Sequence, residues 1–213
     1  STQILVAGTT DQGAVSKLLI GPSNGPLRRS QVSGALSRPA WAPDNNEVWI
    51  GDGSTLYRVD LNGHKSPVQL TAGSGTVSGR ILAVRFSPEG ARIALVIKGE
   101  GGASQIWVGW VLRSPKSVRV SGLNAISPLN VKITDVAWND AHNLFAIGEN
   151  TTSGDANVYE VECDGSQWTA RGIGNLPQKP DSITLAPNAY AAVSAGPTVW
   201  VQPSGTWKSP SGD

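Results

Sequence analysis

The chain has 213 residues and a formal net charge of +1, from 17 basic and 16 acidic side chains. This near balance excludes the strongly basic footprint of proteins that bind nucleic acid or an anionic membrane surface. A single cysteine, Cys163, excludes an internal disulfide and a thiolate metal site, and two histidines are too few for a histidine-rich one. The 25 glycines and 14 prolines predict many short elements joined by turns.

At the N-terminus, residues 3–7, 16–25 and 26–29 predict three strands. The segment 16–25 aligns with residues 54–63, because both begin with Ser, share a Leu and close with Asn-Gly. This alignment makes the three strands the second, third and fourth of a repeating unit. We therefore expect the first unit to lack its own first strand.

The repeat itself begins with an apolar residue followed by a turn, as in Pro39-Ala40-Trp41-Ala42-Pro43-Asp44. Corresponding anchor residues lie 45, 52 and 47 residues apart, at Trp41, Phe86, Trp138 and Leu185. A spacing of this size matches the blade period of β-propellers.

Three further strands follow each anchor. The second strands are predicted at residues 47–50, 92–97, 143–147 and 190–194. The third strands carry a central aromatic residue in most units and are predicted at 56–59, 106–109, 158–161 and 199–202. The fourth strands are predicted at 67–70, 117–120, 167–171 and 206–208. Between the third and fourth strands, Asn62-Gly63 and Asp164-Gly165 accept the positive φ of tight hairpins.

These elements predict an all-β fold, a β-propeller of four-stranded antiparallel blades, with four complete blades and one three-stranded partial blade. We expect a single domain over residues 1–213, with blades at about 1–31, 32–72, 78–122, 130–173 and 178–210. Blades stacked face to face bury both sides of their middle strands, which explains consecutive apolar runs such as Val48-Trp49-Ile50. A β-sandwich is the alternative, and it does not explain why one strand of each unit carries the aromatic residue.

In a propeller, the loops from second to third strand and from blade to blade emerge on one face around the central channel. Binding is expected on that face. The predicted loops are 8–14, 51–53, 98–104 and 148–155, with inter-blade loops at 28–37, 71–80, 121–132 and 172–181. The candidate binding residues on the loop face and channel rim are Arg38, Asp135, Asp181 and Arg80. The alternative is that Arg38 and Asp135 are ordinary rim charges.

Patterns for catalysis are weak throughout the chain. Residues 21–25 match the Gly-x-Ser-x-Gly pattern of serine hydrolases, but they lie in a predicted hairpin and not in the strand-to-helix turn that this chemistry requires. Asp135 and Asp181 are the only carboxylates near the innermost strands, which is too few for a calcium site. His64 and His142 are expected on the opposite rim, in solvent. We therefore predict no catalytic residue, metal or cofactor.

Tryptophan is abundant, with eight residues, and exposed indole rings are typical of sugar-binding surfaces. Five of them lie at strand positions that we expect to be buried: Trp41, Trp49, Trp107, Trp138 and Trp200. The other three lie on outer or terminal strands where exposure is possible: Trp110, Trp168 and Trp207. A glycan-binding propeller that senses cell-wall polymer is therefore an alternative function.

Residues 37–44, the pair Val48-Trp49 and residues 133–138 resemble the β-propeller domain of the actinobacterial lipoprotein LpqB family. The string Arg-Pro-x-Trp-x-Pro-Asp at residues 38–44 is the most specific part of this resemblance. The resemblance implies that a lipid-attached cysteine and a sporulation/germination-type domain precede the propeller in the parent protein. Because the chain begins at Ser1 and lacks methionine, we expect it to be a fragment of such an extracytoplasmic, membrane-anchored lipoprotein.

The same resemblance implies a partner, the extracytoplasmic domain of the sensor histidine kinase MtrB, and a role in modulating MtrAB two-component signalling. The leading hypothesis is thus a non-catalytic protein-interaction module that reaches the membrane only through an anchor outside this chain. A metal-assisted hydrolase such as a lactonase is a third hypothesis, after glycan binding.

Overall fold

The computed structural model describes residues 5–10, 16–114, 117–173, 178–186, 190–195 and 198–202. The regular elements of these residues are β-strands, as predicted. No helix in this part of the chain has the length and apolar character needed to cross a membrane. The predicted fourth strand at 206–208 and Trp207 lie outside the described residues.

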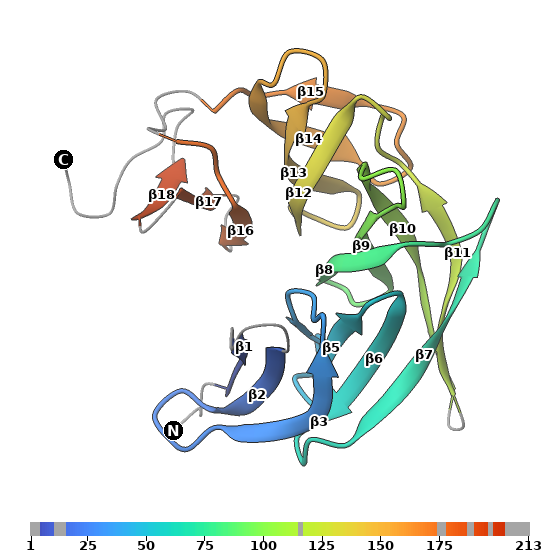
Figure 1. Cartoon of the computed structure of the whole chain (residues 1–213), viewed down its shortest axis with the longest axis vertical. Coiled ribbons are helices and arrows are strands. Elements are labelled where there is room, and N and C mark those ends of the chain that lie inside the picture. Colours follow the sequence, from blue (N-terminus) through green and yellow to red (C-terminus); the bar gives the residue numbers. More distant parts are fainter. Residues whose placement is uncertain are drawn as a thin grey trace.

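The strands form five consecutive antiparallel groups arranged about a common centre (Figure 1). The first group contains β1 (Leu5–Thr10), β2 (Ser16–Pro22) and β3 (Arg28–Gly34). The second contains β4 (Ala40–Trp41), β5 (Glu47–Asp52), β6 (Thr55–Asp60) and β7 (Lys65–Ala72). The third contains β8 (Arg80–Phe86), β9 (Arg92–Lys98), β10 (Ser104–Arg113) and β11 (Val118–Ala125). The fourth contains β12 (Val131–Trp138), β13 (Asn143–Asn150), β14 (Ala156–Glu162) and β15 (Trp168–Ala170), and the fifth β16 (Ser182–Ala186), β17 (Tyr190–Ala195) and β18 (Thr198–Gln202).

Each hydrophobic cluster lies between two successive groups, which is the packing of propeller blades. Along β9, Ile93, Leu95 and Ile97 join a cluster with residues of the second group. The intervening Ala94 and Val96 point the other way, into a cluster with residues of the fourth group. Because successive side chains of a strand point to opposite faces, a strand covered on both faces requires an uninterrupted apolar run. This packing confirms the propeller and excludes the β-sandwich.

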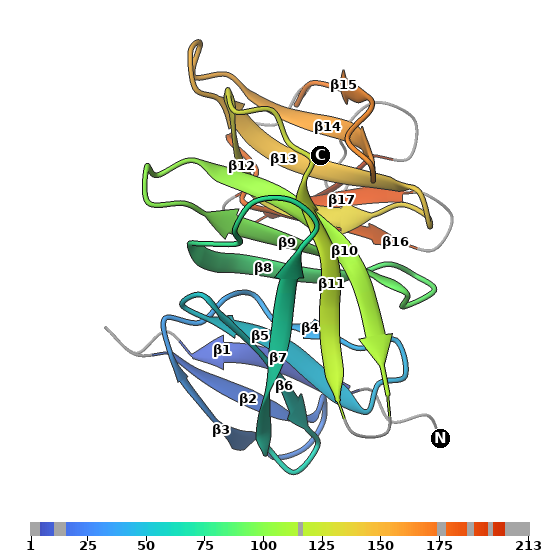
Figure 2. The same ribbon diagram turned by 90° about the vertical axis from the view of Figure 1, so that its right-hand side faces the viewer.

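One strand pairing departs from the expected separate blades. The outer strands β7 and β11 run side by side and parallel, with Val120 opposite Leu70, so the second and third groups share an eight-stranded sheet (Figure 2). Strand β11 pairs with β7 as far as Leu123 and with β10 as far as Ala125, which lies opposite Trp107. Strand β3 likewise continues to Gly34, opposite Ser16 of β2. The inter-blade loops predicted at 28–37 and 121–132 are therefore wrong over residues 28–34 and 121–125, which are strand.

The tight turns follow the predicted turn chemistry. Gly63 and Gly165 have φ values of 88° and 81°, which confirms the left-handed conformation predicted for the two glycines. Beside Gly63, the Asp60 carboxylate accepts hydrogen bonds from the main-chain N–H groups of Asn62 and His64, both at 2.9 Å. Hydrogen bonds from the N–H groups of a turn to an aspartate within the same turn stabilise the hairpin locally.

Two of the innermost strands, β8 in the third group and β12 in the fourth, each contain a β-bulge. The pairing register shifts between Ile81 and Ala83 in β8, and between Ile133 and Asp135 in β12. The extra residues, Leu82 and Thr134, thus occupy equivalent places in neighbouring blades. Bulges redirect side chains and free carbonyl groups, and they are frequent beside functional sites.

Candidate binding site at the channel mouth

The carboxylate of Asp135 lies fully buried at the inner edge of β12. Both of its oxygens accept hydrogen bonds from Nη2 of Arg85, at 2.9 Å each. The main-chain N–H groups of Val136 and Ile183 also donate to this carboxylate, at 2.9 and 3.2 Å. The third, fourth and fifth blades therefore meet at this one buried charge.

Arg38 connects the second blade to the same point. Its Nη1 lies 3.3 Å from an Asp135 oxygen and donates to the Thr134 carbonyl at 3.2 Å, while Nη2 donates to the Asp181 carbonyl at 2.7 Å. The Thr134 carbonyl is available because it belongs to the bulge of β12. The side chain of Asp181 accepts instead from the hydroxyl of Ser194.

Three of the four predicted site residues are thus brought together, namely Arg38, Asp135 and Asp181, the last through its main chain. Arg85 completes the network and was not predicted from the sequence, because an arginine near the end of a strand resembles a solvent-facing position. The available signal was a charged residue among the apolar residues Val84 and Phe86 of an innermost strand. The network ties four blades around the channel and leaves neither Asp135 oxygen without a cationic neighbour.

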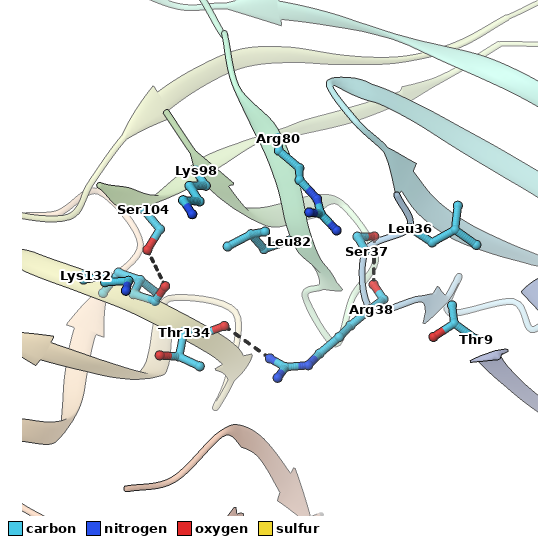
Figure 3. A pocket seen from close by; sticks show the side chains of 11 residues that line it. Thr9, Leu36, Ser37, Arg38, Arg80, Leu82, Lys98, Ser104, Lys132 and Thr134 are labelled. Carbon is cyan, nitrogen blue, oxygen red and sulfur yellow. Dashed lines mark hydrogen bonds between the residues drawn. The ribbon is translucent and has the colours of Figure 1, made fainter. Parts of the chain in front are cut away.

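Arg80, the fourth predicted residue, lines a pocket of about 480 Å³ beside this network. We call it the mouth pocket. Four cationic side chains line it, from Arg38, Arg80, Lys98 and Lys132, and none of its lining residues is acidic (Figure 3). Leu36 and Leu82 contribute apolar surface to the wall of the mouth pocket.

The strand ladder explains why these cations lie close together. Arg80 begins β8 and lies directly opposite Lys98, the last residue of β9. Lys132 enters from the start of β12 in the next blade, and all three side chains are exposed. In the described part of the chain, none of the three has an ion pair or a hydrogen bond from its side chain. The ladder partner of Lys132 is Glu149, but Glu149 pairs with Lys179 at 3.0 Å.

Two buried serine hydroxyls hold the wall of the mouth pocket in place. The hydroxyl of Ser104 donates to the Ile133 carbonyl at 2.5 Å and so links the third blade to the fourth. The hydroxyl of Ser37 accepts from the Gly51 N–H at 2.8 Å. Because both serines are almost fully buried, these contacts fix the backbone around the pocket before any ligand arrives.

A second pocket, of about 400 Å³, contains the predicted candidate Trp110. The side chain of Trp110 is 51% exposed, and the Arg92 guanidinium lies 4.7 Å from its ring centre. Of the five tryptophans expected to be buried, Trp49 and Trp138 are buried, whereas Trp41, Trp107 and Trp200 are only half-buried. The Nε1 of Trp168 donates to the Ile126 carbonyl at 3.0 Å. Trp110 is thus the described tryptophan with the ring most open to a ligand.

No acidic side chain and no histidine of the described residues lines the mouth pocket, whereas His142, Cys163 and Asp164 line the second pocket. Among the described residues, no group of three or more His, Cys, Asp or Glu side chains is placed to hold a metal ion. His64 and His142 are both exposed, and His64 pairs with Asp60 at 3.2 Å.

A family model described as the lipoprotein LpqB β-propeller domain matches residues 2–211. Lipoprotein LpqB of Rhodococcus opacus is 29% identical over 193 residues, which cover 81% of this chain and 30% of the relative. Lipoprotein LpqB of Mycolicibacterium smegmatis is 33% identical over 98 residues, which cover 44% of this chain and 16% of the relative. The chain thus spans less than a third of the length of these curated relatives.

Solved structures share the architecture at much lower identity. TolB from Acinetobacter baumannii matches with a TM-score of 0.60 and 17% identity, over 91% of this chain and 48% of that one. A gluconolactonase from Xanthomonas campestris matches with a TM-score of 0.66 and 15% identity, over 91% of this chain and 67% of that one. At such identities the likeness shows the propeller fold alone, since one fold carries many functions.

Proposed function

Because the chain belongs to the lipoprotein LpqB β-propeller family, we propose that it is the non-catalytic protein-interaction module of a membrane-anchored lipoprotein of the cell envelope. The lipoprotein names of the relatives support the anchored parent protein. The Asp135 carboxylate supports a structural role over catalysis, because it is fully buried and its oxygens already contact Arg38, Arg85 and two main-chain N–H groups.

The proposed partner is the extracytoplasmic domain of an MtrB-type sensor histidine kinase, whose signalling the module modulates. The observation that carries this proposal is the mouth pocket, where Arg80, Lys98 and Lys132 present positive charge without an acidic neighbour in the lining. An acidic surface of the partner would be attracted to this face, and such complementarity governs the rate and specificity of docking. The network around Asp135 links the blades that carry these three cations.

A titration of the kinase's purified extracytoplasmic domain into this chain tests the proposal. We expect saturable binding that weakens by about tenfold or more in the double variant Arg80→Glu/Lys132→Glu, and that weakens with added salt. Arg119→Glu, at an exposed position of the outer strand β11, is the matched control and should bind like the wild type. Absence of binding at high micromolar concentration, or an equal loss in both variants, contradicts the proposal.

Glycan binding is the second candidate, and the exposed ring of Trp110 favours it. Apolar sugar faces stack on indole rings, and the neighbouring Arg92 and Asn124 of this pocket supply polar groups. Titration with soluble cell-wall fragments should then shift the tryptophan fluorescence of the wild type but not of Trp110→Ala. Trp168→Phe is the matched control because Trp168 lies partly buried on Tyr159. An unchanged wild-type spectrum rejects this candidate.

A further inference from the structure

Beyond the docking of a protein, we propose that the mouth pocket is a binding site for a phosphate monoester. The ligand is a phosphate group carried by a sugar-sized molecule or by the end of a polymer chain. The inference concerns the isolated chain and does not depend on the kinase as partner.

Arg80 and Lys98 carry like charges in the lining of the mouth pocket. The two residues lie directly opposite one another in the β8–β9 ladder, where side chains of like charge repel and opposite charges attract. Their charged ends extend on either side of Leu82 (Figure 3). A bound anion between them turns this repulsion into two attractions, so the free pocket is electrostatically prepared for a negative ligand.

Two carboxylates beside the mouth pocket, those of Asp135 and Glu149, already have partners. Asp135 faces two guanidinium groups, those of Arg38 and Arg85, so the network keeps one formal positive charge. Glu149, the ladder partner of Lys132, is engaged by Lys179. These two carboxylates therefore do not neutralise Arg80, Lys98 and Lys132.

The choice of phosphate follows from the number of donors. Arg80, Lys98 and Lys132 come from three different strands and carry three positive charges. A phosphate monoester has about −1.5 to −2 charges at neutral pH and three acceptor oxygens. A single carboxylate has one charge and two oxygens, which leaves part of this donor set unused. The guanidinium fork suits two phosphate oxygens and the ammonium groups act as point charges.

The size and walls of the mouth pocket indicate more than a bare anion. Its volume of about 480 Å³ lies in the range of small-molecule sites. Leu36 and Leu82 provide apolar surface, and Thr9 and Thr134 provide hydroxyl groups. A sugar ring attached to the phosphate would find both kinds of contact.

Calorimetry and thermal unfolding of the whole chain test this inference at constant ionic strength. The probes are inorganic phosphate, glucose 6-phosphate, a phosphorylated oligosaccharide, glucose and acetate. We expect saturable binding of the phosphate probes, with a dissociation constant on the order of 1 mM or below, a raised melting temperature, and binding about tenfold weaker for acetate. Glucose should not bind. Tighter binding of the oligosaccharide than of glucose 6-phosphate identifies a polymer end as the source.

The matched variants are Arg80→Gln/Lys98→Gln, which removes the opposed pair, and Arg119→Gln, which removes an exposed charge elsewhere. Phosphate binding should fall by about tenfold in the first and stay unchanged in the second. Lys132→Gln gives an independent test if the double variant does not fold. Equal binding of acetate and phosphate, or equal binding by the variants and the wild type, overturns the inference. Phosphate binding without kinase binding rejects only the docking proposal, and the converse result rejects only this one.

Discussion

Arg85 and Asp135 join neighbouring blades through one guanidinium nitrogen that donates to both carboxylate oxygens at 2.9 Å. The two residues come from β8 and β12, the innermost strands of the third and fourth blades. Arg38 approaches the same carboxylate from the second blade at 3.3 Å. Since the Asp135 side chain is fully buried, these partners replace the water that its charge would otherwise require.

Replacing Asp135 by Ala should destabilise the fold strongly. The substitution leaves the Arg85 guanidinium without its partner in a mostly buried place, and loss of one partner of a buried ion pair costs about 3–5 kcal/mol. Urea denaturation measures this change in the free energy of unfolding. Asp155→Ala, at an exposed loop position, should change it by about 0.5 kcal/mol or less. Equal stability of the two variants would show that the network does not hold the blades together.

Removing Arg38 should cost much less than removing Asp135. The Arg38 side chain is 39% exposed, so solvent screens its attraction to Asp135, and Arg85 remains in place. We expect Arg38→Ala to lower the free energy of unfolding by about 1 kcal/mol. The same urea titration measures this value. A loss as large as that of Asp135→Ala contradicts the assignment of Arg85 as the principal partner.

Lys98→Glu should stabilise the chain while it removes anion binding. The substitution places a carboxylate directly opposite Arg80, which converts a repulsive cross-strand pair into an attractive one. Such a change contributes about 0.2–1 kcal/mol. Thermal unfolding at low salt should show a higher midpoint than the wild type, and the same sample should no longer bind phosphate. A lower midpoint would mean that Arg80 and Lys98 do not repel one another in the native state.

The strand pattern of the chain was predictable because burial leaves a local trace. The runs at 93–97 and 144–147 are apolar without interruption since both faces of β9 and β13 are covered. The parallel pairing of β7 with β11 left no such trace, because it joins two outer strands whose local patterns are compatible with either solvent or a neighbour. The ends of β3 and β11 also lie beyond their predicted positions, because the local sequence does not show how far a strand keeps its neighbour.

The site was predictable only in part. Arg38 and Asp135 were found because they occupy equivalent positions of a repeat, but their contact depends on how the blades are rotated about the channel. The pairing of Arg80 with Lys98 depends on the ladder register and on a bulge at Leu82, which no local pattern specifies. The same is true of Lys132, which only the packing of the fourth blade brings to the mouth pocket.

Gly51→Ala should disturb the packing of the second blade against the third. A Cβ atom at Gly51 would lie 2.6 Å from the Cβ of Ile81, which belongs to a rigid part of that side chain. Overpacking of this kind costs about 1–3 kcal/mol. Chemical denaturation should show this loss for Gly51→Ala. Gly8→Ala is the control because its Cβ would have no neighbour within 4 Å, and a comparable loss there would contradict the explanation.

The stability that Asp140 contributes should disappear in acid. Burial raises the pKa of Asp140, but hydrogen bonds from Asn143 and from the His142 main chain outweigh it and hold the pKa below its ordinary value of 3.8. A carboxyl group with a lowered folded pKa stabilises fully above pH 3.8 and loses this effect as the pH falls through the folded value. Asp140→Ala should therefore cost about 1 kcal/mol at pH 7 and little in strong acid. A pH-independent difference from the wild type contradicts this.

Hydrogen–deuterium exchange of the chain with and without the kinase's extracytoplasmic domain tests docking at the mouth pocket, because it locates the contact surface without mutation. The docking face contains the start of β8, the end of β9 and the start of β12, which carry Arg80, Lys98 and Lys132. We predict that the partner slows exchange in these three segments and leaves the turns around His64 and His142 unchanged. Protection at those turns, with none at the mouth pocket, would show that the partner docks elsewhere.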